Sequence, residues 1–216
     1  MSKHKSDGHS SDHVADLQRD LHSHLPSDPA LRVKALESLL VEKNLVDSST
    51  VDAWIDLYVE EIGPKRGAKV VARAWTDPAY RLRLLENGAK GITEMGFEGM
   101  AGGHLRVVEN TDAVHNLVVC TLCSCYPHTI LGIQPNWYKT AAYRARAVRD
   151  PNGVLVEFGV ALADYVEIRV WDSTAELRYL VLPQRPVETE GWSAEHLASI
   201  VSRNAMIGTA LAKVST

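Results

Sequence analysis

Three cysteines within six residues limit what this 216-residue chain can fold into more than any other feature. They lie in the segment C-T-L-C-S-C, residues 120–125, and the sequence has no other cysteine. An odd number of thiols so close together is a poor disulfide framework, and a reducing compartment disfavours disulfides in any case. The spacing is instead typical of a metal site.

The composition is that of a soluble globular protein, with 45% hydrophobic and 23% charged residues. A net charge of −4 gives the chain no general attraction to nucleic acid or to an anionic membrane. No apolar run is long enough to span a bilayer, and the first residues lack the apolar stretch of a signal peptide. We expect a cytoplasmic protein that binds neither nucleic acid nor membrane.

The pattern along the chain predicts an α+β fold, in which an extended N-terminal helical arm precedes a layered α-β-β-α metal-binding domain. Residues 1–27 are rich in Ser, Asp, Lys and His and predict a flexible tail, with metal capture by its histidines as the alternative. Residues 28–100 predict short helices whose modest apolar stripes suit packing on a partner subunit. Residues 101–216 predict the α+β catalytic domain.

Caps and apolar periods give the individual elements. In the arm, helices are expected after residues 28–29, after 48–50, up to about Trp75, and from 77–78 to 87–88; the second is expected to bury an apolar stripe. This stripe comprises Trp54, Ile55, Tyr58, Val59 and Ile62. The glycine-rich segment 88–103 predicts a loop. Strands are expected at 105–108, 117–119, 166–170, 177–182 and 205–210, with helices within 138–158 and after Ser193.

The cysteine segment can surround one metal ion. Cys123 and Cys125 are separated by one residue, so both sulfurs can reach the same ion with the backbone nitrogens of Ser124 and Cys125 between them. These four donors can lie in one plane, and Cys120 can cap that plane as a fifth ligand. The sixth position then stays open for water or substrate, as in catalytic sites.

Spacing alone leaves other sites open. Structural zinc takes four ligands in a tetrahedron, and here the fourth would have to be His115, His128 or a distant side chain. An iron–sulfur cluster needs a fourth ligand as well. A catalytic nitrogen–sulfur site, zinc, an iron–sulfur cluster and inert thiols all fit the spacing.

Longer segments carry a resemblance to a known family. The segment VVCTLCSCYP resembles the metal-binding signature of nitrile hydratase α subunits. LGIQPNWYKTAAYRARAVRDP, VEIRVWDSTAELRYLVLPQRP and TEGWS resemble the carboxy-terminal domain of the same family. The resemblance covers residues 30 to 212 approximately and is strongest from Val107 onward.

The resemblance implies the cofactor. The ligands would be the sulfurs of Cys120, Cys123 and Cys125 and the backbone nitrogens of Ser124 and Cys125. Cys123 would be oxidised to sulfinic acid and Cys125 to sulfenic acid. Thr121 stands where cobalt enzymes have Thr and iron enzymes Ser, which favours non-corrin cobalt(III) over iron(III).

The resemblance also implies hydration of a nitrile to an amide, with Cys125 and Ser124 as catalytic residues. The oxygen on Cys125 would act as a nucleophile toward the nitrile carbon or as a base toward water. A β subunit, either one chain or split, would supply arginines to the oxidised sulfurs, and an activator protein would load the metal. Arg144 and Arg146 are local candidates for the same charge balance.

Further residues follow from the resemblance. Asp172 and Glu176 match an acidic pair in the outer shell of the metal. Ala101, Tyr126 and His128 would line the substrate pocket, and two of them depart from the family pattern. The family usually has Gln in place of Ala101 and Trp in place of His128, so we expect a larger pocket suited to a bulky nitrile, for example a nucleoside nitrile such as toyocamycin.

Two other functions stay open. Thiocyanate hydrolase has a metal-bearing subunit with the same cysteine pattern but breaks a different bond. A non-catalytic zinc-binding interaction protein would hold zinc on unoxidised thiols.

Overall fold

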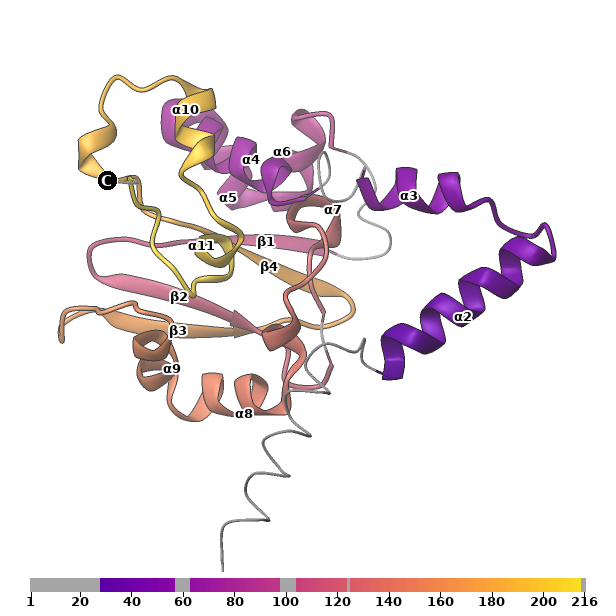
Figure 1. The fold of residues 1–216 in the computed structure, drawn as a ribbon. Coiled ribbons are helices and arrows are strands. Elements are labelled where there is room, and N and C mark those ends of the chain that lie inside the picture. The colour runs from indigo at the N-terminus through magenta and orange to yellow at the C-terminus, as the bar shows by residue number, and fades with distance from the viewer. Residues whose placement is uncertain (1–27, 57–62, 98–103, 124, 215–216) are drawn as a thin grey trace, which may run out of the picture. The chain divides into compact units, whose positions relative to one another are not determined.

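The computed structural model describes residues 28–56, 63–97, 104–123 and 125–214 (Figure 1). Contacts divide the chain into two compact units, Met1–Trp54 and Ile55–Thr216. Several predictions fall outside the described residues: the tail at 1–27, the inner part of the stripe at 58–62, and the candidate site residues Ala101 and Ser124.

The helices before residue 57 have no buried face in the chain by itself. They are α2 (Asp28–Glu42) and α3 (Ser48–Asp56), and none of residues 29–56 is buried. Trp54 and Ile55 are 56% and 51% exposed, so the expectation that α3 buries them is wrong for this chain alone. A helix of this length gains little stability without a packed face, because nucleation is costly and propensity contributes weakly.

Four strands form the centre of the second unit. They are β1 (His104–Glu109), β2 (Val114–Val119), β3 (Glu167–Asp172) and β4 (Leu177–Leu182). β1 pairs with β4 and β2 with β3, both in parallel. The two pairs form separate two-stranded sheets, and β2 and β4 are the strands that are mostly buried. Each of the four strands was expected from the sequence within a few residues.

Helices cover both sides of the strands, which confirms the predicted α+β class and its α-β-β-α layers (Figure 1). On the β1–β4 side lie α4 (Pro64–Thr76), α5 (Pro78–Glu86), α6 (Gly88–Glu94) and α10 (Ala194–Ser199). On the β2–β3 side lie α8 (Ala141–Arg149) and α9 (Pro151–Glu157). The short elements are α7 (His128–Leu131), α11 (Arg203–Ile207) and two 3₁₀ turns, η2 (Asn136–Lys139) and η3 (Val187–Thr189). Within the described ranges, no helix has the length and apolarity needed to cross a bilayer.

The boundary between arm and domain falls earlier than residue 100. The helix α4 buries Val70 and Val71 completely in the core of the second unit, and α5 and α6 pack on β1. These three helices therefore belong to the compact domain. Small residues of α4 allow close approach in this core: a Cβ at Gly67 would lie 2.6 Å from the Met206 sulfur.

Two sequence predictions for local structure are wrong. The glycine-rich segment expected as a loop begins with the helix α6, because the Asn87 side chain caps it by accepting from the Lys90 N–H. The glycines allow close packing in this helix: Gly88 packs against the Leu105 carbonyl, and Gly91 packs against Leu84. The expected final strand at 205–210 is the helix α11, which Ser202 caps at its start. The apolar run at 205–210 is too short for its pattern to distinguish a helix from a strand.

We predict that Gly208→Ala destabilises the fold by about 2–5 kcal/mol. Gly208 has φ +93° and ends α11, and an added Cβ would lie 1.9 Å from the Asn116 carbonyl oxygen of β2. The left-handed backbone costs about 1–2 kcal/mol for a non-glycine residue, and the overpacking about 1–3 kcal/mol more. Urea unfolding of the chain, followed by tryptophan fluorescence, measures this loss.

Gly159→Ala is the matched control, because Gly159 also has a positive φ of +76° but nothing lies within 4 Å of its added Cβ. Its loss is expected to be only the backbone cost, about 1–2 kcal/mol. Equal losses in the two variants would contradict the close approach of α11 to β2.

Candidate metal centre

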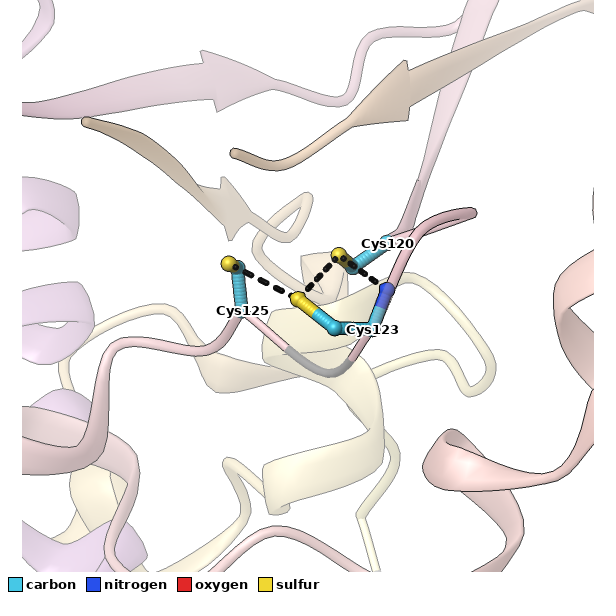
Figure 2. Close-up of side chains that lie close together, drawn as sticks. All are labelled: Cys120, Cys123 and Cys125. Carbon is cyan, nitrogen blue, oxygen red and sulfur yellow. Dashed lines mark hydrogen bonds between the residues drawn. The ribbon is translucent and has the colours of Figure 1, made fainter. Parts of the chain in front are cut away.

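The cysteine loop, residues 120–125, follows directly from the buried end of β2. Cys120 is 1% exposed, Cys125 is half-buried and Cys123 is exposed. The Sγ atoms of Cys120 and Cys123 lie 3.4 Å apart, and those of Cys123 and Cys125 lie 3.3 Å apart. Figure 2 shows the three sulfurs turned toward one another, and all lie within 4.8 Å. The Cys123 N–H also donates to the Cys120 sulfur at 3.3 Å.

The chemistry of these donors fits a metal ion. Burial, the hydrogen bond with Cys123 and the charge of Cys120 raise the pKa of the Cys125 thiol to about 12. Three thiolates this close repel one another, and a bound cation reverses the effect because it favours the deprotonated sulfur. None of the three is in a disulfide. The arrangement is therefore a preformed cluster of soft ligands.

Asp172 holds the beginning of the cysteine loop. It is the last residue of β3 and pairs in register with Val119, the last residue of β2. Its carboxylate accepts the Thr121 N–H at 2.9 Å and, through the other oxygen, the Thr121 hydroxyl. Because the two strands are parallel, their carboxyl ends meet at one edge, which places this acidic side chain beside the sulfurs.

The second member of the expected acidic pair makes no hydrogen bond to the described part of the cysteine loop. Glu176 is exposed, and among the described residues its carboxylate has no hydrogen bond or ion pair. Its backbone carbonyl accepts the His104 N–H at 2.6 Å. The structure thus brings Asp172, and not Glu176, to the cysteine loop.

Two tyrosines that the sequence analysis missed also reach this loop. The Tyr138 phenol donates to the Cys125 carbonyl at 3.0 Å, and the Tyr143 phenol donates to the Val118 carbonyl at 2.7 Å. Burial raises the pKa of both phenols well above the usual range, so both keep their protons and act as donors. The local sequence carries no signal for these contacts, which join residues 13 and 25 positions apart.

The two local arginines differ in their contacts. Arg144 donates to the Thr121 carbonyl at 3.2 Å and so contacts the backbone of the cysteine loop. Arg146 instead forms ion pairs with Glu157 and Asp150 on the exposed side of α8 and α9. Arg144 is therefore the one of the pair that the fold places at the loop.

Two of the expected pocket residues, Tyr126 and His128, follow directly after the loop. Tyr126 is buried, with its ring centroid 5.4 Å from that of Tyr138 and 5.3 Å from that of His128. His128 is exposed, and its Nδ1 lies 2.9 Å from the Tyr126 carbonyl oxygen. This contact fixes the imidazole at the start of α7.

The fold and the site define a class of protein: an α+β subunit that carries a cluster of thiol ligands on the loop after a buried parallel strand. The family model described as nitrile hydratase, alpha chain, matches residues 27–210. The chain belongs to this family.

Individual relatives agree with this assignment. The chain is 56% identical over 182 residues to the low-molecular weight cobalt-containing nitrile hydratase subunit alpha of Rhodococcus rhodochrous, covering 84% of this chain and 88% of the relative. A double mutant of the iron-type nitrile hydratase from Comamonas testosteroni Ni1 matches in structure with a TM-score of 0.77 and 42% identity, covering 87% of this chain and 92% of that chain. The thiocyanate hydrolase subunit gamma of Thiobacillus thioparus is 40% identical over 198 residues, covering 87% of this chain and 81% of that relative.

We predict that Asp172→Asn loosens the beginning of the cysteine loop, because an amide nitrogen replaces one of the two acceptor oxygens that Thr121 uses. A hydrogen bond to a charged group stabilises by about 1.5–3 kcal/mol, so exchange of the Thr121 amide should accelerate roughly ten-fold or more. Hydrogen exchange of the peptide that contains residues 119–123 measures this change. Glu176→Gln is the control, and equal exchange in both variants would contradict the anchoring role of Asp172.

Proposed function

We propose that this chain is the metal-bearing α subunit of a cobalt-type nitrile hydratase, which hydrates a nitrile to the corresponding amide. The observation that carries this proposal is the convergence of three sulfurs within 4.8 Å on a loop beside an exposed surface. The relationship to a cobalt-containing nitrile hydratase α subunit, at 56% identity, supports the choice of reaction and metal.

The proposed ligands are the sulfurs of Cys120, Cys123 and Cys125 and the backbone nitrogens of Ser124 and Cys125. When bound, non-corrin cobalt(III) would supply Lewis-acid chemistry at its open position. We further propose that Cys123 is a sulfinic acid and Cys125 a sulfenic acid. Their exposure supports this, since oxidation follows accessibility: Cys123 is exposed and Cys125 half-buried, whereas Cys120 is 1% exposed.

The residues of this chain then have distinct roles. The oxygen on Cys125 would attack the nitrile carbon or accept a proton from water, next to Ser124. Tyr126 and His128, together with Ala101, would line the pocket, and a small residue at position 101 favours a bulky nitrile. Asp172 would hold the loop through Thr121, with Glu176 farther out.

Partner subunits would complete the site. Cys123 is exposed and its neighbour Leu122 is 84% exposed, so the loop presents both sulfur and apolar surface outward. We propose that a β subunit, one chain or split, covers this face and brings arginines to the oxidised sulfurs, because the negative oxygens need cationic partners. An activator protein would load the metal. All three cysteines serve one site, which suits a cytoplasmic enzyme.

The rival reaction is thiocyanate hydrolysis. The thiocyanate hydrolase subunit is a more distant relative, at 40% identity against 56%, and this favours the nitrile. Amide formation from an aromatic nitrile, compared with carbonyl sulfide release from thiocyanate, separates the two reactions. Zinc on unoxidised thiols would instead indicate the non-catalytic protein.

We predict that the co-expressed complex forms amide from an aromatic nitrile and that Cys125→Ser lowers kcat by about 100-fold or more, as expected for loss of a nucleophile or base. Peptide mass spectrometry should find one added oxygen on Cys125 and two on Cys123. Full turnover by Cys125→Ser with metal still bound would refute the role of this sulfur.

We also propose that the helices α2 and α3 bind the β subunit. Their apolar side chains are exposed in the chain by itself, and α2 includes Leu36 and Leu40, one turn apart. We predict that Leu36→Glu with Leu40→Glu lowers the β subunit recovered on co-purification about ten-fold or more, because burying a leucine contributes about 1.5–3 kcal/mol. Leu82→Glu on α5, at a leucine that is 67% exposed, is the control, and equal recovery would contradict the proposal.

A further inference from the structure

The backbone of the cysteine loop depends on contacts with residues outside the loop for its conformation. The described residues of the loop belong to no helix or strand, so no regular hydrogen-bonding pattern fixes their backbone. Their sulfurs nevertheless converge within 4.8 Å, although these residues have no regular structure of their own that would keep them there. Contacts to the loop backbone must therefore hold the ligands in place.

One short segment supplies three such contacts. Residues 138–144 span the end of η2 and the first turn of α8, and three side chains there donate to backbone carbonyls, two in the loop and one near the end of β2. The pairs are Tyr138 to Cys125 at 3.0 Å, Arg144 to Thr121 at 3.2 Å and Tyr143 to Val118 at 2.7 Å. The contacts are spread from just before the first cysteine to the last one.

The donor segment is itself rigid. Thr140 caps α8 by accepting the Tyr143 N–H at 3.2 Å. The rings of Tyr138 and Tyr143 pack 5.7 Å apart, and Trp137 packs on Phe158 at 4.8 Å. Tyr138 is fully buried. Donors fixed in this way lose little entropy when they hold the loop.

We infer that Tyr138 is a positioning residue of the metal site, which fixes Cys125 through its carbonyl while Arg144 holds Thr121 and Tyr143 holds the end of β2 that leads into the loop. This inference rests on the proposed function. Tyr138 holds the backbone of the residue whose sulfur is proposed to take part in the reaction, whereas the Tyr143 contact lies in β2, before the first cysteine. Without the phenol, Cys125 loses its fixed distance to the other sulfurs.

The test compares Tyr138→Phe with Tyr80→Phe in the co-expressed complex. The control removes a matched group, because the Tyr80 phenol is also fully buried and donates to a backbone carbonyl, that of Gly91, at 3.0 Å. Tyr80 lies in α5, on the opposite side of the strands from α8 (Figure 1). Both variants are loaded with cobalt under identical conditions.

Three quantities are measured: cobalt retained after a chelator challenge, the sulfur-to-cobalt charge-transfer absorption per bound cobalt, and the fraction of Cys125 that carries oxygen. For Tyr138→Phe we expect a fall of about 10- to 100-fold in cobalt affinity, the range for residues that orient metal ligands, with a changed charge-transfer spectrum and less oxidised Cys125. Tyr80→Phe should match the wild type in all three.

Two results would overturn the inference. Tyr138→Phe with unchanged cobalt retention, spectrum and Cys125 oxidation would show that the phenol does not position the ligand. Equal losses in Tyr138→Phe and Tyr80→Phe would assign the effect to general stability. Wild-type complex that binds no cobalt would overturn the proposed function, and the inference with it.

Discussion

The convergence of three sulfurs at the end of a buried strand is the constraint on which the site depends. The described residues of the loop belong to no helix or strand, so the surrounding structure must supply the fixed hydrogen bonds that hold its backbone before a cation is bound. The layered fold meets this need from two sides. The parallel neighbour β3 ends beside the loop and supplies Asp172, while η2 and α8 supply phenol and guanidinium donors to the loop carbonyls. The core around the site fixes positions that the loop cannot fix by itself.

Burial also separates the roles of chemically identical side chains. Cys120 follows directly from β2 and is almost completely buried, whereas Cys123 is exposed. A buried thiol is suited to ligation alone, and an exposed one remains accessible to oxidation and to a partner. Leu122 and the helices before residue 57 likewise expose apolar side chains in the chain by itself. The first cysteine of the loop is therefore part of the core, whereas Cys123 and Leu122 lie at the surface.

The sequence predicted the strands well because short apolar runs, and in β3 an alternation of apolar and charged residues, are typical of strands. It also placed the cysteine cluster, since ligand spacing within six residues leaves the backbone few ways to separate the sulfurs. It failed where glycine served packing, as at Gly91, and where a short apolar run fitted either helix or strand, as in α11. The partners of the loop were harder to foresee. Asp172 was expected, but Tyr138 depends on tertiary contacts that no local pattern encodes.

The most direct test of the central claim is X-ray absorption at the cobalt edge of the co-expressed complex. If the cysteine loop holds the ion as proposed, the nearest shell contains three sulfurs and two nitrogens, with one further light-atom ligand. A shell of nitrogen and oxygen alone would contradict the account. So would zinc in place of cobalt, in a closed tetrahedral centre.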